Sequence, residues 1–226
     1  MQTVSQAFGR LDGLRLIHLQ CATGEDTLSW SALGLDSIGV DISEEQIFLA
    51  QRKAKEAGFK TRFLAEDIYN LPACLPNEWY GQGFDVVFTG GGALVWLPDL
   101  AEWAKIIFTL LKPGGRLILK EEHPIRSCLW VENGQIKVVD DYFRRTNPIE
   151  DKGWYHFQGG EDAQEVKYEF AWPIGDVVTA LARTGLVIES LEEIPGGPEW
   201  RLQYDQGFMG RLPGQYILMA RKEHEK

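Results

Sequence analysis

The first half of the chain alternates short apolar runs with segments of helical period, and this alternation limits the fold more than any other feature. The apolar runs are predicted strands at residues 14–19, 37–40, 61–65, 84–89 and 117–119. Helical periods lie between them, most clearly at residues 43–57 and 100–111. Strands that alternate with helices in this way predict βαβ units on a parallel sheet, with ligands beyond the carboxyl ends of the strands.

The helix that starts near residue 43 has the clearest sequence boundaries. Ser43 and Gln46 form an S-x-x-Q pattern, in which each side chain is expected to satisfy a free amide at the helix N-terminus. Small and apolar residues then repeat on one face that we expect to be buried, and Gly58 ends the helix. The repeating residues are Ile47, Ala50, Ala54 and Ala57.

The pattern changes after the fifth predicted strand. Residues 124–172 carry many aromatic side chains without a sustained helical period, and we interpret them as an inserted lobe of irregular or antiparallel structure. Helical spacing resumes at residues 177–181, and residues 186–191 and 215–220 are predicted as two final strands. A chain of 226 residues fits one domain, so we expect residues 1–226 to form a single domain that carries the lobe as an insertion.

Composition excludes several classes of protein. Hydrophobic residues make up 44% of the chain and charged residues 25%, which is typical of a folded globular protein. The net charge of −10 disfavours nucleic acid and anionic membranes as partners. We find no signal peptide or membrane span, and we expect Cys21, Cys74 and Cys128 to be reduced thiols of a cytoplasmic protein. Composition leaves the oligomeric state open.

One carboxylate follows the second predicted strand where the sugar of a nucleoside would bind. Asp41 follows Gly24 by one helix and one strand, a spacing that suits hydrogen bonds to two ribose hydroxyls. The alternative role, a helix cap, is weakened because Ser43 already fits it. A dinucleotide site needs G-x-G-x-x-G to admit a pyrophosphate, whereas the turn at residues 20–24 has one glycine, so the turn favours a cofactor without phosphate.

Five segments in this order resemble the class I S-adenosylmethionine-dependent methyltransferases. They are residues 16–24 (LIHLQCATG), 39–43 (GVDIS), 65–68 (AEDI), 84–89 (FDVVFT) and 111–116 (LKPGGR). Residues 18–27 (HLQCATGEDT) are similar to a small-molecule-type bacterial branch of that family. The resemblance implies an α/β, Rossmann-like, doubly wound and mostly parallel seven-stranded sheet, with an antiparallel C-terminal strand and a lobe inserted after strand five.

The resemblance also implies S-adenosylmethionine as the cofactor and a set of residues that bind it. The turn at residues 20–24 would hold the methionine part and the sugar, with Asp41 on the ribose and Ile42 on the adenine face. Asp67 and the Ile68 amide would meet the adenine edge, and the backbone at residues 89–90 would meet the methionine ammonium. The expected cofactor-binding residues are Gln20, Cys21, Ala22, Gly24, Asp41, Ile42, Asp67, Ile68, Thr89 and Gly90.

The chain departs from the family pattern in the first turn and before it. His18 stands where the family usually has a carboxylate, and Gln20 and Ala22 stand where it usually has glycine. These differences keep open a cofactor-impaired or non-catalytic binding protein of the same fold. Only residues 1–13 precede the first strand, where the family usually has helices that help to close the site. We therefore expect that the chain is naturally short, that it is truncated, or that the insertion closes the site.

The acceptor site is expected near the end of the fifth strand, where Glu121, Glu122 and His123 follow one another. His123 is the candidate catalytic base, because imidazole titrates near neutral pH. The alternative is a structural histidine that hydrogen-bonds to the turn at Pro124. His156 is a weaker candidate. The aromatic lobe is expected to form pocket walls, a small satellite core, or both.

Other chemistries lack a motif in this chain. The sequence contains no HExxH, GxSxG or P-loop pattern and no paired-histidine pattern, so we expect no metal site. We therefore predict a methyltransferase that moves a methyl group from S-adenosylmethionine to an unidentified small molecule. An NAD-dependent oxidoreductase on a similar sheet is an alternative, as is the non-catalytic binding protein.

Overall fold

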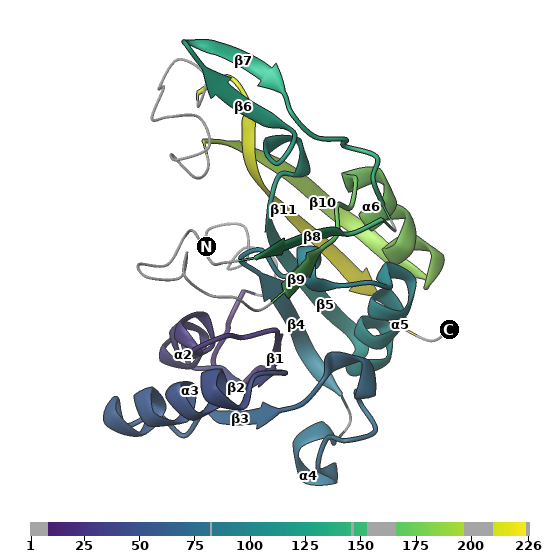
Figure 1. Cartoon of the computed structure of the whole chain (residues 1–226). Helices are drawn as coiled ribbons and strands as arrows, with labels where there is room; N and C mark the ends of the chain where they lie inside the picture. Colours follow the sequence, from purple (N-terminus) through teal and green to yellow (C-terminus); the bar gives the residue numbers. More distant parts are fainter. Residues whose placement is uncertain (1–8, 82, 146, 153–165, 197–209, 225–226) are drawn as a thin grey trace.

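A seven-stranded sheet forms the centre of the molecule in the computed structural model, which describes residues 9–81, 83–145, 147–152, 166–196 and 210–224 (Figure 1). The strand order is β10-β11-β5-β4-β1-β2-β3. These strands are β1 (Arg15–Leu19), β2 (Asp36–Asp41), β3 (Arg62–Ala65), β4 (Phe84–Gly90), β5 (Leu111–Glu122), β10 (Leu186–Pro195) and β11 (Pro213–Lys222). Strand β11 runs antiparallel to both β5 and β10, and the other neighbouring strands pair in parallel. The predicted fold class is confirmed.

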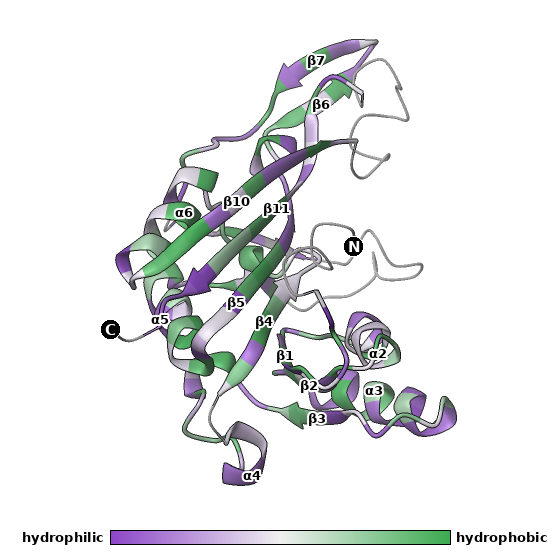
Figure 2. Cartoon of the chain, turned by 180° about the vertical axis from the view of Figure 1, so that it is seen from behind, coloured by the Kyte–Doolittle hydropathy of each residue, from purple (hydrophilic) through white to green (hydrophobic). Residues whose placement is uncertain are grey.

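Helices cover both faces of the sheet. They are α2 (Glu25–Ala32), α3 (Glu44–Glu56), α4 (Asn77–Tyr80), α5 (Leu100–Leu110) and α6 (Ile174–Arg183), with short 3-10 helices η1 (Ile68–Asn70), η2 (Leu94–Trp96) and η3 (Pro124–Arg126). On one face, Trp103 of α5 and Leu181 of α6 pack with Leu19 of β1 in the largest core cluster. On the other face, Trp30 of α2 packs against Phe88 of β4. Figure 2 shows α2 and α3 beside β1 to β3 from behind, with hydrophobic residues along β5 and β11.

Helix α3 begins as predicted but is capped differently. The Ser43 side chain accepts a hydrogen bond from the Gln46 amide at 3.3 Å. The Ser43 amide donates to the Asp41 carboxylate at 3.0 Å, so Asp41 is its partner instead of the predicted Gln46 side chain. Ile47, Ala50 and Ala54 are buried, whereas Ala57 is exposed, so the prediction of a buried Ala57 was wrong. The helix ends at Glu56, which places Ala57 at its C-cap, beyond the buried face.

Strand β5 is longer than predicted because it begins directly where α5 ends. Leu110 is the last residue of α5 and Leu111 the first of β5, so residues 113–115 belong to the strand rather than to a separate turn. Gly115 lies against β4, since a Cβ at this position would stand 2.7 Å from the Phe84 carbonyl oxygen. Gly115 therefore permits a close approach of two strands.

The segment after β5 forms two small antiparallel pairs. Strands β6 (Leu129–Glu132) and β7 (Gln135–Val138) make one, and β8 (Ile149–Lys152) and β9 (Val166–Glu169) make the other. In Figure 1, β8 and β9 lie in front of the central sheet. We call residues 124–152 and 166–172 the lobe. His156 lies outside the described residues, as do Trp154, Tyr155 and Phe157.

None of the described helices has the length and apolar character that crossing a bilayer requires.

Candidate functional site

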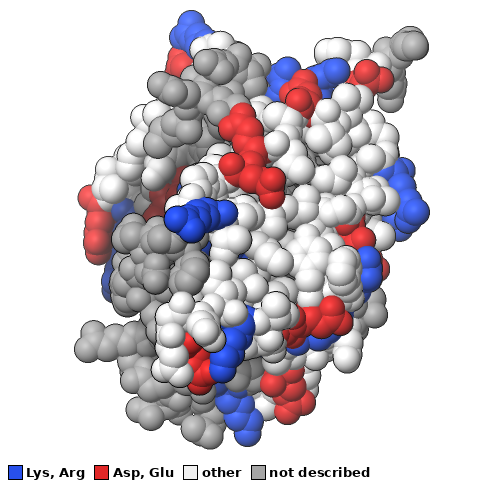
Figure 3. All heavy atoms as spheres, turned by 90° about the horizontal axis from the view of Figure 1, so that it is seen from above, with Lys and Arg blue, Asp and Glu red and all other residues white. Residues whose placement is uncertain are grey.

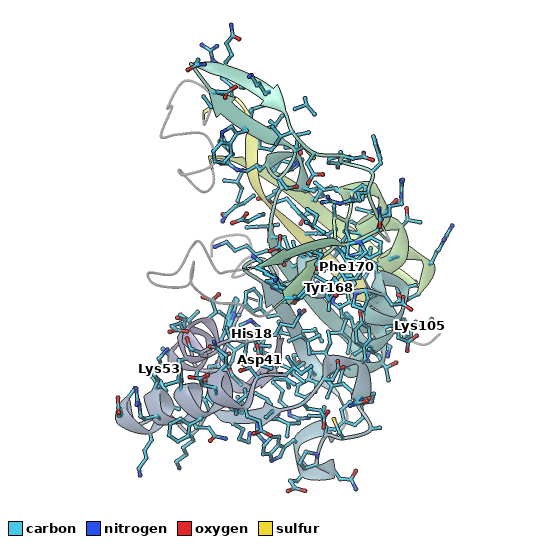
Figure 4. All side chains as sticks on the ribbon, in the orientation of Figure 1. His18, Asp41, Lys53, Lys105, Tyr168 and Phe170 are labelled. Carbon is cyan, nitrogen blue, oxygen red and sulfur yellow. The ribbon has the colours of Figure 1, made fainter. Side chains whose placement is uncertain are left out.

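The carboxyl ends of four neighbouring parallel strands gather the predicted cofactor residues at one edge of the sheet. Leu19 of β1 pairs with Val40 of β2 on one side and with Thr89 of β4 on the other. Asp41 in turn pairs with Ala65 of β3. Chain order reverses around β1, and this is the position where sheets of this type bind ligands. Figure 4 shows Asp41 and His18 on these strands, with Tyr168 and Phe170 above them.

The turn after β1 adopts the backbone of a glycine-rich turn although it contains one glycine. Gln20 has φ 58°, Ala22 has φ 45° and Gly24 has φ 82°. The two non-glycine residues stand where the family usually has glycine, so this chain keeps the left-handed conformation and adds side chains. At position 24 a side chain cannot be added, because a Cβ there would lie 2.9 Å from both Ala50 and Phe63.

Asp41 connects this turn to the end of β2. Its Oδ2 accepts a hydrogen bond from the Ala22 amide at 2.8 Å, and its Oδ1 accepts one from the Ser43 amide at 3.0 Å. The residue is half-buried. Each carboxylate oxygen can accept a second hydrogen bond, so these contacts orient the group toward the turn and leave capacity for ligand hydroxyls.

Two polar atoms at the ends of β1 and β4 lack hydrogen-bond partners within the described part of the chain. The Gln20 side chain donates from Nε2 to the Ala93 carbonyl at 3.0 Å, which leaves its Oε1 shielded from water without a donor. Thr89 is fully buried and its Oγ1 has no partner. Shielded polar atoms without partners are costly and rare in folded proteins. Both residues stand at the strand ends where the methionine ammonium is predicted to bind.

The other predicted cofactor residues differ in their exposure and in their contacts. Ile42 is 71% exposed, so its side chain is free to cover a ligand. Asp67 accepts a hydrogen bond from the Tyr69 amide at 2.9 Å, and Ile68 is buried. Gly90 admits no side chain, because a Cβ there would stand 2.2 Å from the Lys120 carbonyl oxygen. Cys21 packs against Ala50 and Phe63 on the side of α3, and burial raises the pKa of its thiol.

His18 replaces the usual carboxylate with a neutral ring. Its Nδ1 lies 2.8 Å from the Thr27 hydroxyl oxygen, and its ring centroid lies 4.7 Å from that of Phe88. Burial lowers the pKa of His18 to about 3, so the imidazole is uncharged at neutral pH. The side chain therefore joins β1 to α2 and brings no negative charge to the site.

A cavity of about 1020 Å³ begins directly after the end of β4. We call the carboxyl ends of β1 to β4, where the predicted cofactor residues lie, the cofactor edge. The walls of the cavity come from Gly91 and Gly92 after β4, from η2, from the end of β5 and from the lobe. Gly91 and Gly92 follow Thr89 and Gly90 directly, so the cofactor edge and the cavity share one segment of chain. The described lobe residues thus line a pocket, as well as packing on the sheet.

Glu121 lies at the inner end of this cavity beneath the turn after β4. Its Oε1 accepts hydrogen bonds from the Ala93 amide at 2.7 Å and the Leu94 amide at 3.2 Å, and its Oε2 accepts one from the Gly92 amide at 3.0 Å. Only 3% of the residue is exposed. Burial raises the pKa of Glu121 to about 7, because desolvation outweighs the three amides that favour the charged form.

His123 lines the same cavity, with both ring nitrogens in hydrogen bonds. Nδ1 accepts from the Ile125 amide at 3.1 Å, and Nε2 lies 2.8 Å from a Glu193 carboxylate oxygen. Because Nδ1 is an acceptor, the proton is assigned to Nε2, which donates to Glu193. Burial lowers the pKa of His123, and the Glu193 carboxylate opposes that shift. The ring caps η3, as in the structural alternative for this residue, and its role as catalytic base stays a prediction.

Several cavity residues carried no signal in the sequence. Arg144 and Lys167 line the lobe side of the cavity, but each stands in a polar stretch that looks like any surface segment. The signal that the sequence did contain was the aromatic content of the lobe, and Trp130, Phe170 and Trp172 all line the cavity. In the described ranges, no three His, Cys, Asp or Glu side chains lie close enough to hold a metal ion.

Comparison with known proteins agrees with this geometry. A methyltransferase domain family matches residues 11–169. The chain is 38% identical over 122 residues to a demethylmenaquinone methyltransferase of Lactococcus lactis, a match that spans 51% of this chain and 45% of that protein. It is 25% identical over 232 residues to an uncharacterized protein of Haemophilus influenzae, covering 97% of this chain and 85% of that one.

A solved structure shares the whole fold. The S-adenosylmethionine-dependent methyltransferase of Mesorhizobium loti superposes with a TM-score of 0.70 at 21% identity, over 97% of this chain and 96% of that chain. These findings favour S-adenosylmethionine over the nicotinamide alternative and confirm the predicted cofactor class. The chain belongs to the methyltransferase domain family and has the fold of its class I S-adenosylmethionine-dependent members.

Proposed function

We propose that this protein transfers a methyl group from S-adenosylmethionine to a small molecule bound in the cavity beneath the lobe. The observation that carries the proposal is the shared segment at residues 89–92: its first half ends a strand at the cofactor edge, and its second half lines the cavity. A ligand at the end of β4 and a ligand in the cavity would therefore lie next to each other, as a displacement at carbon requires. The Lactococcus relative, by its name, also acts on a small molecule.

The residues at the strand ends fit the cofactor. Asp41 would accept hydrogen bonds from the ribose hydroxyls, Ile42 would cover the adenine face, and Asp67 with the Ile68 amide would meet the adenine edge. The methionine ammonium would lie by Thr89, Gly90 and the unpartnered Gln20 Oε1. When bound, S-adenosylmethionine supplies an electrophilic methyl carbon, whose bond to sulfur breaks with its electron pair left on sulfur as the acceptor's nucleophile bonds to carbon.

The cavity residues orient the acceptor and take up its proton. His123 is the proton acceptor proposed from the sequence, and it would act as a base after the Ile125 amide releases Nδ1. Glu121 is a second proton acceptor at the same end, since its Oε2 accepts only one of the three amide hydrogen bonds. An oxygen or nitrogen nucleophile would lose its proton to one of these groups as the new bond forms.

Calorimetric titration with S-adenosylhomocysteine tests the cofactor site directly. We expect binding, and at a concentration of 100 times Kd a stabilisation of roughly 2.7 kcal/mol, seen as a rise in Tm. Asp41→Ala should weaken this binding roughly 5- to 150-fold, because loss of hydrogen bonds to a charged group costs about 1–3 kcal/mol. Asp36→Ala is the matched control, since Asp36 begins the same strand at the opposite edge. Equal affinity in the Asp41 variant would contradict the ribose assignment.

A cofactor-impaired binding protein is the second candidate, and two observations favour it. Both Asp41 oxygens already bind backbone amides, and His18 gives the site no negative charge. The titration separates the two functions, because a protein of this second kind would not bind S-adenosylhomocysteine at high excess.

A further inference from the structure

Aromatic side chains form much of the cavity wall. Five of its twenty lining residues are aromatic, about twice the 12% of the whole chain. They are Trp96, Trp130, Phe170, Trp172 and Tyr216. The rings of Phe170 and Trp172 lie at 12° to each other with centroids 6.3 Å apart. Flat walls of this kind bind planar rings well.

These walls are attached to the turn after β4 by backbone and side-chain hydrogen bonds. The Phe170 amide donates to the Val95 carbonyl at 2.7 Å, and the Trp172 indole donates to the Leu97 carbonyl at 3.0 Å. The lobe and η2 therefore hold the two aromatic rings in fixed positions beside the segment shared with the cofactor edge. A planar ring bound against these walls would be oriented before reaction, which is the main task of such a pocket.

Arg144 on the lobe wall has more donors than its surroundings use. Its side chain is only 18% exposed, and Asp140, at 2.9 Å from Nη2, is its single hydrogen-bond partner among the described residues. Its Nε is shielded from water and has no partner among the residues that the structure describes. A guanidinium offers five N–H donors, and leaving them unfilled in a buried place is costly. The side chain is thus arranged to receive a further oxygen ligand.

The charged residues divide between the two ends of the cavity. Arg144 and Lys167 lie on the lobe wall, where Arg144 pairs with Asp140 and Lys167 pairs with Glu169. Glu121 lies at the sheet end, where the nucleophile must meet the methyl group. A molecule with an anionic group at one end and a proton-bearing nucleophile at the other fits this division.

We propose that the acceptor is a planar aromatic acid, whose carboxylate binds Arg144 and whose hydroxyl or amine points to the sheet end of the cavity. The proposal rests on the proposed function, because the reacting end is defined by the cofactor edge. Arg144 is a binding and specificity residue in this arrangement. An aromatic amine, which the carboxylates of the lining would attract, is the competing class that the experiment tests.

The experiment compares three probes by calorimetry on the full chain saturated with S-adenosylhomocysteine. The probes are 4-hydroxybenzoate, its neutral analogue 4-hydroxybenzamide, and the cationic tyramine. We expect 4-hydroxybenzoate to bind at least roughly tenfold more tightly than either of the other two, since hydrogen bonds between ions are the stronger ones. Equal affinities, a preference for tyramine, or no binding of any probe would overturn the proposal.

A variant pair assigns the preference to Arg144. Arg144→Gln should weaken 4-hydroxybenzoate roughly 10- to 100-fold and leave 4-hydroxybenzamide unchanged, whereas Arg144→Lys should retain part of the preference. Arg145→Gln is the control, because Arg145 pairs with Asp176 and does not line the cavity. An equal loss for both probes would show a structural role and overturn the assignment. If the Arg144 variants do not fold, the probe comparison on the unsubstituted chain still decides the class.

The same titrations distinguish failure of this inference from failure of the proposed function. Absence of S-adenosylhomocysteine binding contradicts the proposed function before any probe is added. Binding of S-adenosylhomocysteine without discrimination among the probes contradicts only the acceptor class.

Discussion

At the scale of single residues, the turn after β1 shows that non-glycine residues can hold a backbone conformation that glycine favours. Gln20 and Ala22 adopt positive φ values, which cost L-residues roughly 1–2 kcal/mol each in the left-handed region. Two hydrogen bonds stabilise this conformation: the Ala22 amide donates to the Asp41 carboxylate, and the Gln20 side chain donates to the Ala93 carbonyl. The sequence marks these two residues as departures from the family, and in the structure both adopt the left-handed conformation that glycine favours.

Ala22→Gly should therefore stabilise the protein. Ala22 is exposed, so the substitution removes strain without removing buried surface, and we expect the free energy of unfolding to rise by about 1 kcal/mol. Chemical denaturation of the two proteins measures the difference. Gly24→Ala is the opposite change two residues away, and it should destabilise because its Cβ would stand 2.9 Å from Ala50 and Phe63. A stability of Ala22→Gly equal to or below that of the parent would show that the turn is not strained.

His18 makes stability depend on pH in a defined window. Its pKa is about 3 in the folded protein and 6.5 when unfolded, so the unfolded chain binds more protons between these values. Stability from His18 is fully present above pH 6.5 and is lost as the pH falls toward 3, by up to about 5 kcal/mol. When unfolding is measured across this pH range, the free energy of unfolding of His18→Asn should fall less steeply with decreasing pH than that of the parent. Identical pH profiles in the two proteins would mean that His18 is protonated when folded.

At the scale of elements, the start of α3 shows which contacts a short sequence pattern can predict. Ser43 and Gln46 are three residues apart, and the predicted hydrogen bond from the Gln46 amide is present. The partner of the Ser43 amide was mispredicted, because Asp41 competes for it from the end of β2. The same carboxylate thus links the helix start, the strand end and the cofactor turn.

Ser43→Ala should destabilise the protein by about 1 kcal/mol, since the helix loses its N-cap side chain. Ser29→Ala is the control: Ser29 lies within α2 and its hydroxyl donates to the Glu25 carbonyl of the same helix, so the substitution should be close to neutral. Thermal or denaturant unfolding compares both variants with the parent. Equal changes in stability in the two variants would contradict a capping role for Ser43.

At the scale of the whole molecule, the net negative charge disfavours nucleic acid as a partner. The chain carries −10, and Figure 3 shows acidic and basic side chains interspersed on the upper face without a continuous basic patch. A nucleic acid would therefore release few counterions on binding. We expect no retardation of transfer RNA or duplex DNA in gel-shift assays at about 0.15 M salt. Binding that weakens steeply with added salt would contradict this expectation.

The sequence by itself determined the order of strands and helices and the family, and it predicted the strand ends at which the cofactor would bind. Each of these follows from local patterns, because apolar period, cap residues and turn residues act over a few neighbouring positions. Asp41 was predicted from its position at a strand end and Thr89 from the family resemblance, and the sheet brings both to one edge.

Only the tertiary structure decided what the side chains at this edge contact. His123 meets Glu193, which is 70 residues away, and Gln20 meets Ala93, which is 73 residues away. The polar stretch that contains Arg144 gave no sign of a cavity, because the cavity exists only once the lobe packs over the end of β5. The physical reason is the same in each case: hydrogen bonding and desolvation depend on neighbours in space, whereas the patterns of a single chain record neighbours in sequence.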